Sequence, residues 1–117
     1  MEYKDLDVWI QARKLVKVVY NLSSKFPNDE KFGLTNQIRR CAVSIPSNIA
    51  EGCGRQHVND SVQFFYISRG SLYELETQLY LSFDLEYINE QILNETLELL
   101  VKTKTILNGF INYFKKK

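Results

Sequence analysis

QIRRCAVSIPSNIAEG, residues 37–52, combines the apolar spacing of a helix with a proline in its middle. Apolar residues recur there at steps of three and four positions and therefore share one helix face: Ile38, Cys41, Ala42, Ile45 and Ile49. Pro46 lacks an N–H group, and its ring presses on the carbonyl of Ala42. The stretch therefore predicts a helix that is bent at Pro46.

The same spacing outside this stretch predicts three further helices, so that four are expected in all and residues 37–52 belong to the second. The first spans about residues 5–26, and the second ends near residue 51. It begins after Asn28 or, if Gly33 interrupts its first turn, at Thr35. The third spans about residues 58–85, and the fourth begins after Asn89. Short connections make consecutive helices antiparallel neighbours. The predicted fold is thus all-α: an antiparallel up-down-up-down four-helix bundle, formed by a single domain over residues 1–117 with its second helix bent at Pro46.

Composition limits the classes of protein to consider. The chain has 117 residues, 44% hydrophobic and 25% charged, as expected for one globular domain with one core. No apolar run is long enough to cross a membrane, and the polar N-terminal residues MEYKDLDVW are unlike a signal peptide. We therefore expect no membrane partner.

The two cysteines, Cys41 and Cys53, fall on the same predicted helix. Twelve helical residues separate them by about 18 Å, whereas a disulfide needs Cα atoms within about 7 Å. An intrachain disulfide is therefore excluded by this helix. We expect a reduced, cytoplasmic protein.

Apolar residues cover wide faces of the predicted helices. One core needs an apolar band of roughly 100°, yet the first and fourth helices each carry two adjacent bands, and Tyr66, Tyr73 and Tyr80 add a row to the third. Exposure of Leu22, Phe110 and these tyrosines would leave large apolar patches. The pattern favours a homo-oligomer over a monomer with a thick core. Stacking of the tyrosines on bases is a weaker alternative, because this helix is acidic.

Charge is uneven along the chain although the net charge is only +1. Residues 1–57 carry nine Lys and Arg against six Asp and Glu, whereas residues 58–86 carry one against five. Basic side chains bind phosphate groups, although most charges on a helix only face solvent. The candidate nucleic-acid contacts are Arg39, Arg40, Arg55, Lys14 and Lys17, with Arg13 and residues 115–117 as further basic positions.

Enzymatic patterns are weak. His57 is the single histidine, and Gly52 and Gly54 separate it from Cys53, which argues against a Cys–His pair on one helix. Cys53, His57 and Asp60 match no established zinc spacing, and the chain has no glycine-rich phosphate loop. We therefore predict no catalytic residue, no metal and no cofactor.

Three stretches carry a family resemblance: YKDLDVWIQA (3–12), FPNDEKFGLTNQIRRCAVSIPSNIAEGCGR (26–55) and FFYISRGSLYELETQL (64–79). Together they resemble the 23S rRNA-intervening sequence proteins, also called S23-like proteins, which include the accessory variability determinants of diversity-generating retroelements. The chain departs from this family at Cys53, where an aromatic residue is common, and at His57, where a serine cap is usual.

The resemblance implies an antiparallel four-helix bundle that assembles as a homopentameric ring. It also implies association with nucleic acid and with a reverse transcriptase, and it makes Arg39 and Arg40 the strongest candidate contacts. Our hypothesis from the sequence is a non-enzymatic, oligomeric bundle that binds structured RNA or DNA through basic residues repeated around a ring. The alternative is a protein-interaction scaffold, for example one docking a reverse transcriptase, with no direct nucleic-acid contact.

Overall fold

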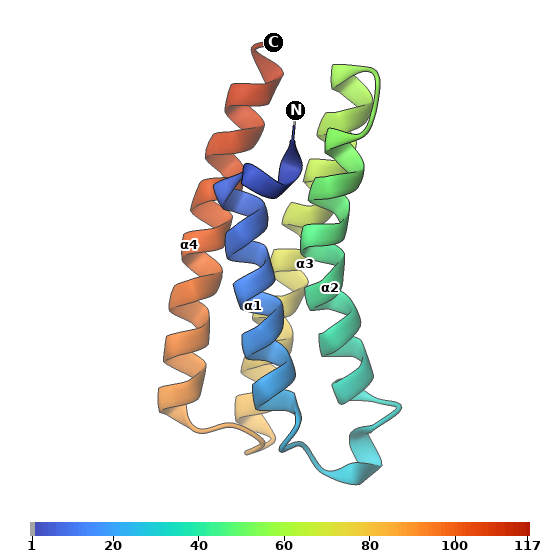
Figure 1. The fold of residues 1–117 in the computed structure, drawn as a ribbon. Coiled ribbons are helices and arrows are strands. Elements are labelled where there is room, and N and C mark those ends of the chain that lie inside the picture. Colours follow the sequence, from blue (N-terminus) through green and yellow to red (C-terminus); the bar gives the residue numbers. More distant parts are fainter. Residues whose placement is uncertain (1) are drawn as a thin grey trace.

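The computed structural model describes residues 2–117 and contains four long helices. In chain order the elements are the 3-10 turn η1 (Tyr3–Asp5), α1 (Asp7–Ser23), the 3-10 turn η2 (Asn28–Glu30), α2 (Leu34–Cys53), α3 (Val58–Asp84) and α4 (Glu90–Lys115). The helices run side by side in alternating directions (Figure 1). No strand occurs in the part of the chain that the structure describes. The predicted all-α four-helix bundle is confirmed.

Local chemistry sets where the helices begin. Asn89 precedes α4, and its Oδ1 accepts a hydrogen bond of 2.8 Å from the backbone N–H of Ile92, as expected for a capping residue. Helix α2 begins at Leu34, one residue before the second predicted start at Thr35, because residues 28–30 form a separate turn. Oε1 of Glu30 then accepts a hydrogen bond of 3.1 Å from the N–H of Leu34, a group that has no partner within the helix because it lies in the first turn of α2.

Helix α1 is shorter than the sequence predicts. Leu6 has an extended backbone conformation, which separates the turn η1 from α1. At the other end α1 stops at Ser23, although the side chain of Phe26 is still buried. The apolar spacing therefore extended the predicted helix as far as Phe26, because this residue packs into the core although it lies in the loop after α1.

The core runs along the whole bundle and uses more of each helix than one narrow stripe. Leu22, which we expected on an outer band, is buried. Phe110 packs against Phe65 with ring centroids 4.9 Å apart, and Phe114 joins the same aromatic cluster. Helices α1 and α4 each contact two antiparallel neighbours, and most residues of their two apolar bands are buried in the same core or pack against it. The argument for an oligomer from Leu22 and Phe110 was therefore wrong.

Helices α2 and α3 pack most closely. Gly52 lets α2 approach α3, because a Cβ at this position would lie 2.5 Å from Cε1 of Phe65. Further along the same contact, Oγ of Ser68 donates a buried hydrogen bond of 2.9 Å to the carbonyl of Ile45. Helix α2 is continuous through Pro46, and its bend there stays a prediction.

Both cysteines lie in α2 as free thiols, which confirms that they form no disulfide with each other. None of the helices in residues 2–117 is long and apolar enough to span a membrane.

Candidate functional site

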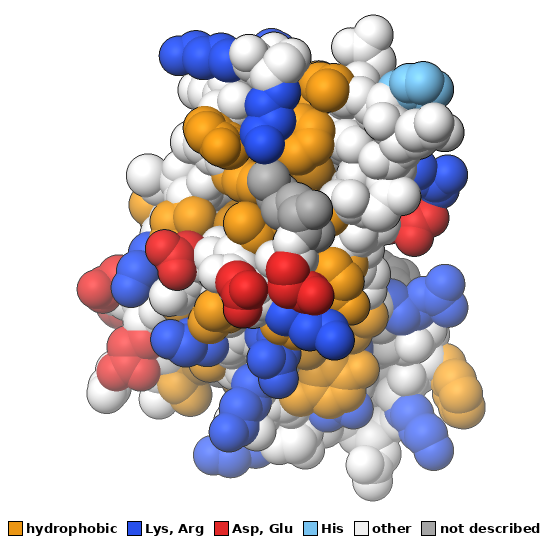
Figure 2. All heavy atoms as spheres, turned by 45° about the horizontal axis from the view of Figure 1, so that its top comes forward, with side chains coloured by type: hydrophobic (Ala, Val, Ile, Leu, Met, Phe, Trp, Pro, Cys, Tyr) orange, Lys and Arg blue, Asp and Glu red, His pale blue; other side chains and the backbone are white. Residues whose placement is uncertain are grey.

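Basic residues concentrate on α1 and α2, which pack side by side. Residues 8–23 of α1 contain three basic and no acidic residues, and residues 34–50 of α2 contain two basic and no acidic residues. Figure 2 shows Lys and Arg side chains gathered around hydrophobic side chains over the lower part of the face it presents, with Asp and Glu side chains across its middle and along its left edge. Helices α1 and α2 therefore carry an excess of positive charge, although Asp7 begins α1 and Glu51 lies near the end of α2.

A groove of about 390 Å³ runs between these two helices, and we call it the α1–α2 groove. It is lined by Arg13, Val16, Lys17, Tyr20, Val43 and Pro46. Tyr20 is 42% exposed and Val43 39% exposed, so apolar surface is open to solvent here. No acidic side chain lines this groove. The site thus combines an apolar floor with two cationic side chains. This combination suits a negatively charged ligand that also has an apolar part.

Arg39 lies beside this groove and is held in place by α1. Its Nε donates a hydrogen bond of 2.8 Å to Oγ of Ser23, and an Nη donates one of 3.3 Å to the carbonyl of Tyr20. Its guanidinium also lies over the ring of Tyr20, with Cζ 4.6 Å from the ring centroid. A cation is favourable at this position because the carbonyls at the C-terminal end of a helix carry partial negative charge.

Arg40 lies on the opposite flank of α2. It lines a polar groove between α2 and α3 together with Gln37, Ser44 and Glu74, among other residues. Arg39 and Arg40 are adjacent in sequence, but a helix turns by about 100° between neighbours. The structure therefore directs these two predicted contacts into different grooves, and Arg40 shares its groove with an acidic side chain.

The other two predicted contacts are farther from the α1–α2 groove. Arg55 follows α2, forms an ion pair of 2.6 Å with Glu51, and lies over the ring of Phe64. Lys14 lies on the flank of α1 that faces α4, because Val18, one turn later, lines the pocket between those helices. Of the five predicted residues, the structure brings Lys17 and Arg39 to the groove.

Sequence reasoning missed the aromatic and apolar part of this site. Tyr20, Val43 and Pro46 come from two helices, and nothing in the sequence joins them until α1 and α2 are packed. Arg13 was recognised only as a basic residue. Its spacing of four residues from Lys17 already placed both on one helix face.

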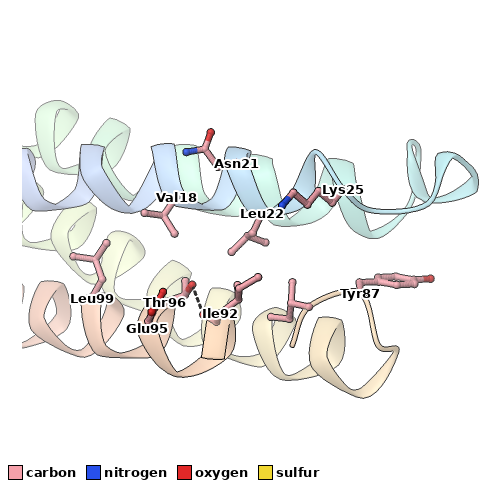
Figure 3. A pocket seen from close by; sticks show the side chains of 10 residues that line it. Val18, Asn21, Leu22, Lys25, Tyr87, Ile92, Glu95, Thr96 and Leu99 are labelled. Atoms are coloured by element: carbon pink, nitrogen blue, oxygen red, sulfur yellow. Dashed lines mark hydrogen bonds between the residues drawn. The ribbon is translucent and has the colours of Figure 1, made fainter. Parts of the chain in front are cut away.

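A second pocket, of about 370 Å³, opens between α1 and α4 (Figure 3). Most of its wall is apolar and includes Val18, Leu22 and Ile92. Its polar residues include Lys25 from the loop after α1 and Glu95 from α4. The opposite charges of these two side chains offset each other. This pocket therefore lacks the one-sided charge of the α1–α2 groove.

The thiols show no sign of activation. Burial raises the pKa of Cys41 to about 12, and burial also raises the pKa of Cys53. Nucleophilic cysteines need a lowered pKa, because the thiolate is the reactive form. His57 directly precedes α3 but makes no capping hydrogen bond with its side chain. Within residues 2–117, no three His, Cys, Asp or Glu side chains cluster as metal ligands would.

Comparison with known proteins places this fold in a defined group. Residues 4–109 match the model of a family described as 23S rRNA-intervening sequence protein. A crystal structure from Bacteroides thetaiotaomicron, of a protein of unknown function from the S23 ribosomal protein family, superposes with a TM-score of 0.82 at 23% identity. The match covers 89% of this chain and 97% of that one. This structural likeness supports the fold. No curated protein matches the sequence.

Proposed function

Because the chain belongs to the 23S rRNA-intervening sequence protein family, we propose that it is a non-enzymatic helical bundle that binds structured RNA through the side formed by α1 and α2. The observation that carries this proposal is the α1–α2 groove, which Arg13 and Lys17 line without any acidic side chain and beside which Arg39 lies. Phosphate groups supply most of the affinity of nucleic-acid complexes. A groove lined by cations and by no carboxylate attracts such a polyanion.

Within this proposal the basic residues have different parts. Lys17 and Arg13 contact phosphates from the α1–α2 groove, and Arg39 adds positive charge beside them. Lys14, Arg40 and Arg55 extend the basic surface on either side. We further propose a homo-oligomer, the pentamer implied by the family resemblance, in which this surface is repeated around an axis. Repetition multiplies the local positive potential beyond what a net charge of +1 provides.

Fluorescence anisotropy of a labelled RNA hairpin, titrated at several salt concentrations, tests the proposal. Phosphate-mediated binding must weaken linearly on a plot of log affinity against log salt concentration. We expect saturable binding that persists near physiological ionic strength. Binding confined to the lowest salt concentration, or none, would overturn the proposal and leave the basic residues as ordinary solvated surface.

Paired variants locate the interface. Arg13→Ala/Lys17→Ala should reduce the magnitude of the salt slope by about two, since each lost phosphate contact removes about one. Lys102→Ala/Lys116→Ala removes the same charge from α4 and the residue after it, and should leave the slope unchanged. Equal losses in both variants would show that only total charge matters. Arg39→Ala is a poorer test, because it also removes two hydrogen bonds to α1.

A second candidate function is a protein-interaction scaffold that docks a partner such as a reverse transcriptase without touching nucleic acid. The observation in its favour is exposed apolar surface on α3 and α4: Tyr73 is 52%, Tyr80 48% and Val101 50% exposed. Binding to a reverse transcriptase that survives ribonuclease treatment, with no RNA binding by the bundle alone, would favour the scaffold.

In either function we propose a cytoplasmic location, consistent with two free thiols.

A further inference from the structure

Two guanidinium groups lie over aromatic rings beside the α1–α2 groove. Cζ of Arg13 is 4.8 Å from the ring centroid of Trp9, and Cζ of Arg39 is 4.6 Å from that of Tyr20. Both arginines are therefore planar cations already stacked on an aromatic surface. The hydrogen bonds of Arg39 to Ser23 and to the Tyr20 carbonyl fix its position over the Tyr20 ring. Tyr20 is thus held in place as an aromatic platform, and 42% of the surface of this residue is still exposed.

A regular RNA duplex would use only part of this surface. It presents phosphates and 2′-hydroxyls on its outside, whereas its bases are stacked and paired inside. Arg13 and Lys17 would contact such phosphates, but Tyr20, Val43 and Pro46 would contact nothing chemically suitable. Exposed apolar surface between cations suits a ligand with a flat apolar part and a nearby negative charge. An unpaired nucleotide has both, because its base is flat and its phosphate is charged.

We propose that the α1–α2 groove binds an unpaired nucleotide of RNA, with its base against Tyr20 and Pro46 and its neighbouring phosphates on Arg13 and Lys17. This inference rests on the RNA-binding function proposed above and adds the structural class of the RNA: one that contains a bulge or a single-stranded loop. Bases splayed out of a helix are read by stacking on aromatic side chains and on arginine planes.

An acidic peptide with an apolar side chain is the other ligand with these properties. The geometry favours the nucleotide, because an aliphatic side chain gains nothing from two guanidinium–aromatic stacks. A base gains from them both by stacking and by the cationic field on its π-face.

Two labelled RNA duplexes that differ only by three unpaired adenosines in one strand distinguish these cases. Anisotropy titrations near physiological salt should give at least about tenfold tighter binding of the bulged duplex. Tyr20→Leu should abolish this preference and keep the binding to the perfect duplex, whereas Tyr20→Phe should retain the preference because its ring still stacks. Tyr113→Leu, an exposed tyrosine on α4, is the matched control and should behave as wild type.

The outcomes separate this inference from the proposed function. Equal affinity for both duplexes, or a preference that survives Tyr20→Leu, would overturn the inference and leave RNA binding through phosphates intact. Binding to neither duplex would overturn both. Binding to a labelled peptide of glutamates and leucines, with no binding to RNA, would assign the groove to a protein partner and overturn both as well.

Discussion

The hydroxyl of Tyr87, between α3 and α4, donates a hydrogen bond of 2.7 Å to Oε2 of Glu30, between α1 and α2. The other oxygen of Glu30 accepts the N–H of Leu34 at the start of α2. The ring of Tyr87 also packs against Phe26, with centroids 5.2 Å apart. One carboxylate therefore joins the two loops at one end of the bundle and caps a helix.

This arrangement makes the stability of the fold depend on pH. The hydrogen bond from Tyr87, and then the bond from the Leu34 N–H, lower the pKa of Glu30 below its usual 4.5. The stabilisation is therefore present above about pH 4.5 and is lost as the pH falls through the lowered pKa. The same hydrogen bond, with some burial, raises the pKa of Tyr87 from 10 to about 12. On the alkaline side the stabilisation is complete below pH 10 and is lost as the pH rises through about 12.

Tyr87→Phe should lower the melting temperature at neutral pH, because it removes the hydrogen bond but keeps the ring. The difference from wild type should shrink below pH 4.5, where wild type also loses the bond. Thermal unfolding followed by circular dichroism between pH 3 and pH 9 measures this difference. Tyr80→Phe is the control, because the hydroxyl of Tyr80 makes no hydrogen bond within residues 2–117. A Tyr87→Phe difference that did not vary with pH would contradict the role of Glu30.

Gly52→Ala should destabilise the protein by about 1–3 kcal/mol, as overpacking of a core does. The added Cβ would lie 2.5 Å from Cε1 of Phe65 and 2.9 Å from the carbonyl oxygen of Ser61, so α2 and α3 must move apart. Urea unfolding at fixed protein concentration measures the change.

Two other helical glycines are controls for this substitution. A Cβ on Gly70 or Gly109 meets nothing within 4 Å. Alanine at either position should stabilise the fold by about 0.5–1 kcal/mol, because glycine loses more backbone freedom in a helix. If Gly52→Ala were also stabilising, the close approach of α2 to Phe65 would not constrain this position.

Most of the fold was predictable from local patterns, and most of the candidate site was not. Apolar spacing located all four helices, and Asn89 marked the start of α4 correctly. These signals are local, since they depend on residues within one or two turns of each other. The wide apolar faces wrongly predicted that Leu22 and Phe110 would be exposed in a single bundle. How many neighbouring helices cover a face depends on the packed bundle and not on the sequence of one helix.

The α1–α2 groove depends on how two helices are placed, which no local pattern describes. Tyr20 and Pro46 gain their shared role only when α1 lies against α2. The separation of Arg39 from Arg40 was predictable, because adjacent helical residues point about 100° apart. The bend at Pro46 is still a prediction: Pro46→Ala should leave the fold intact and straighten α2, and crystal structures of both proteins would show the difference.

The two thiols should react slowly and at different rates in the folded protein. Cys41 is buried, and this burial raises its pKa to about 12, so very little of the thiol is ionised near neutral pH. Cys53 is half-buried at the end of α2 and should react first. Iodoacetamide labelling at pH 8, followed by mass spectrometry, gives both rates, and both thiols should react quickly in urea. Rapid labelling of Cys41 in the native protein would show that α2 and α3 separate readily.

Oligomer formation should depend on the outer face of α3 and α4. Tyr73 and Tyr80, seven residues apart on α3, are each about half exposed, and Nζ of Lys104 from α4 lies 4.3 Å from the ring centroid of Tyr73. Light scattering should give the wild type a mass several times the 13.7 kDa of one chain. Tyr73→Glu/Tyr80→Glu should reduce this mass to that of one chain, because buried carboxylates without partners oppose association.

Tyr113→Glu is the matched control for this face. Tyr113 is 59% exposed near the end of α4, and its substitution should leave the mass unchanged if the interface is confined to the region around Tyr73 and Tyr80. A monomeric wild type would refute assembly through this face and with it the repeated basic surface. The α1–α2 groove of a single chain would then have to supply all of the RNA affinity, and the slope of affinity against salt would be no steeper than its few cations allow.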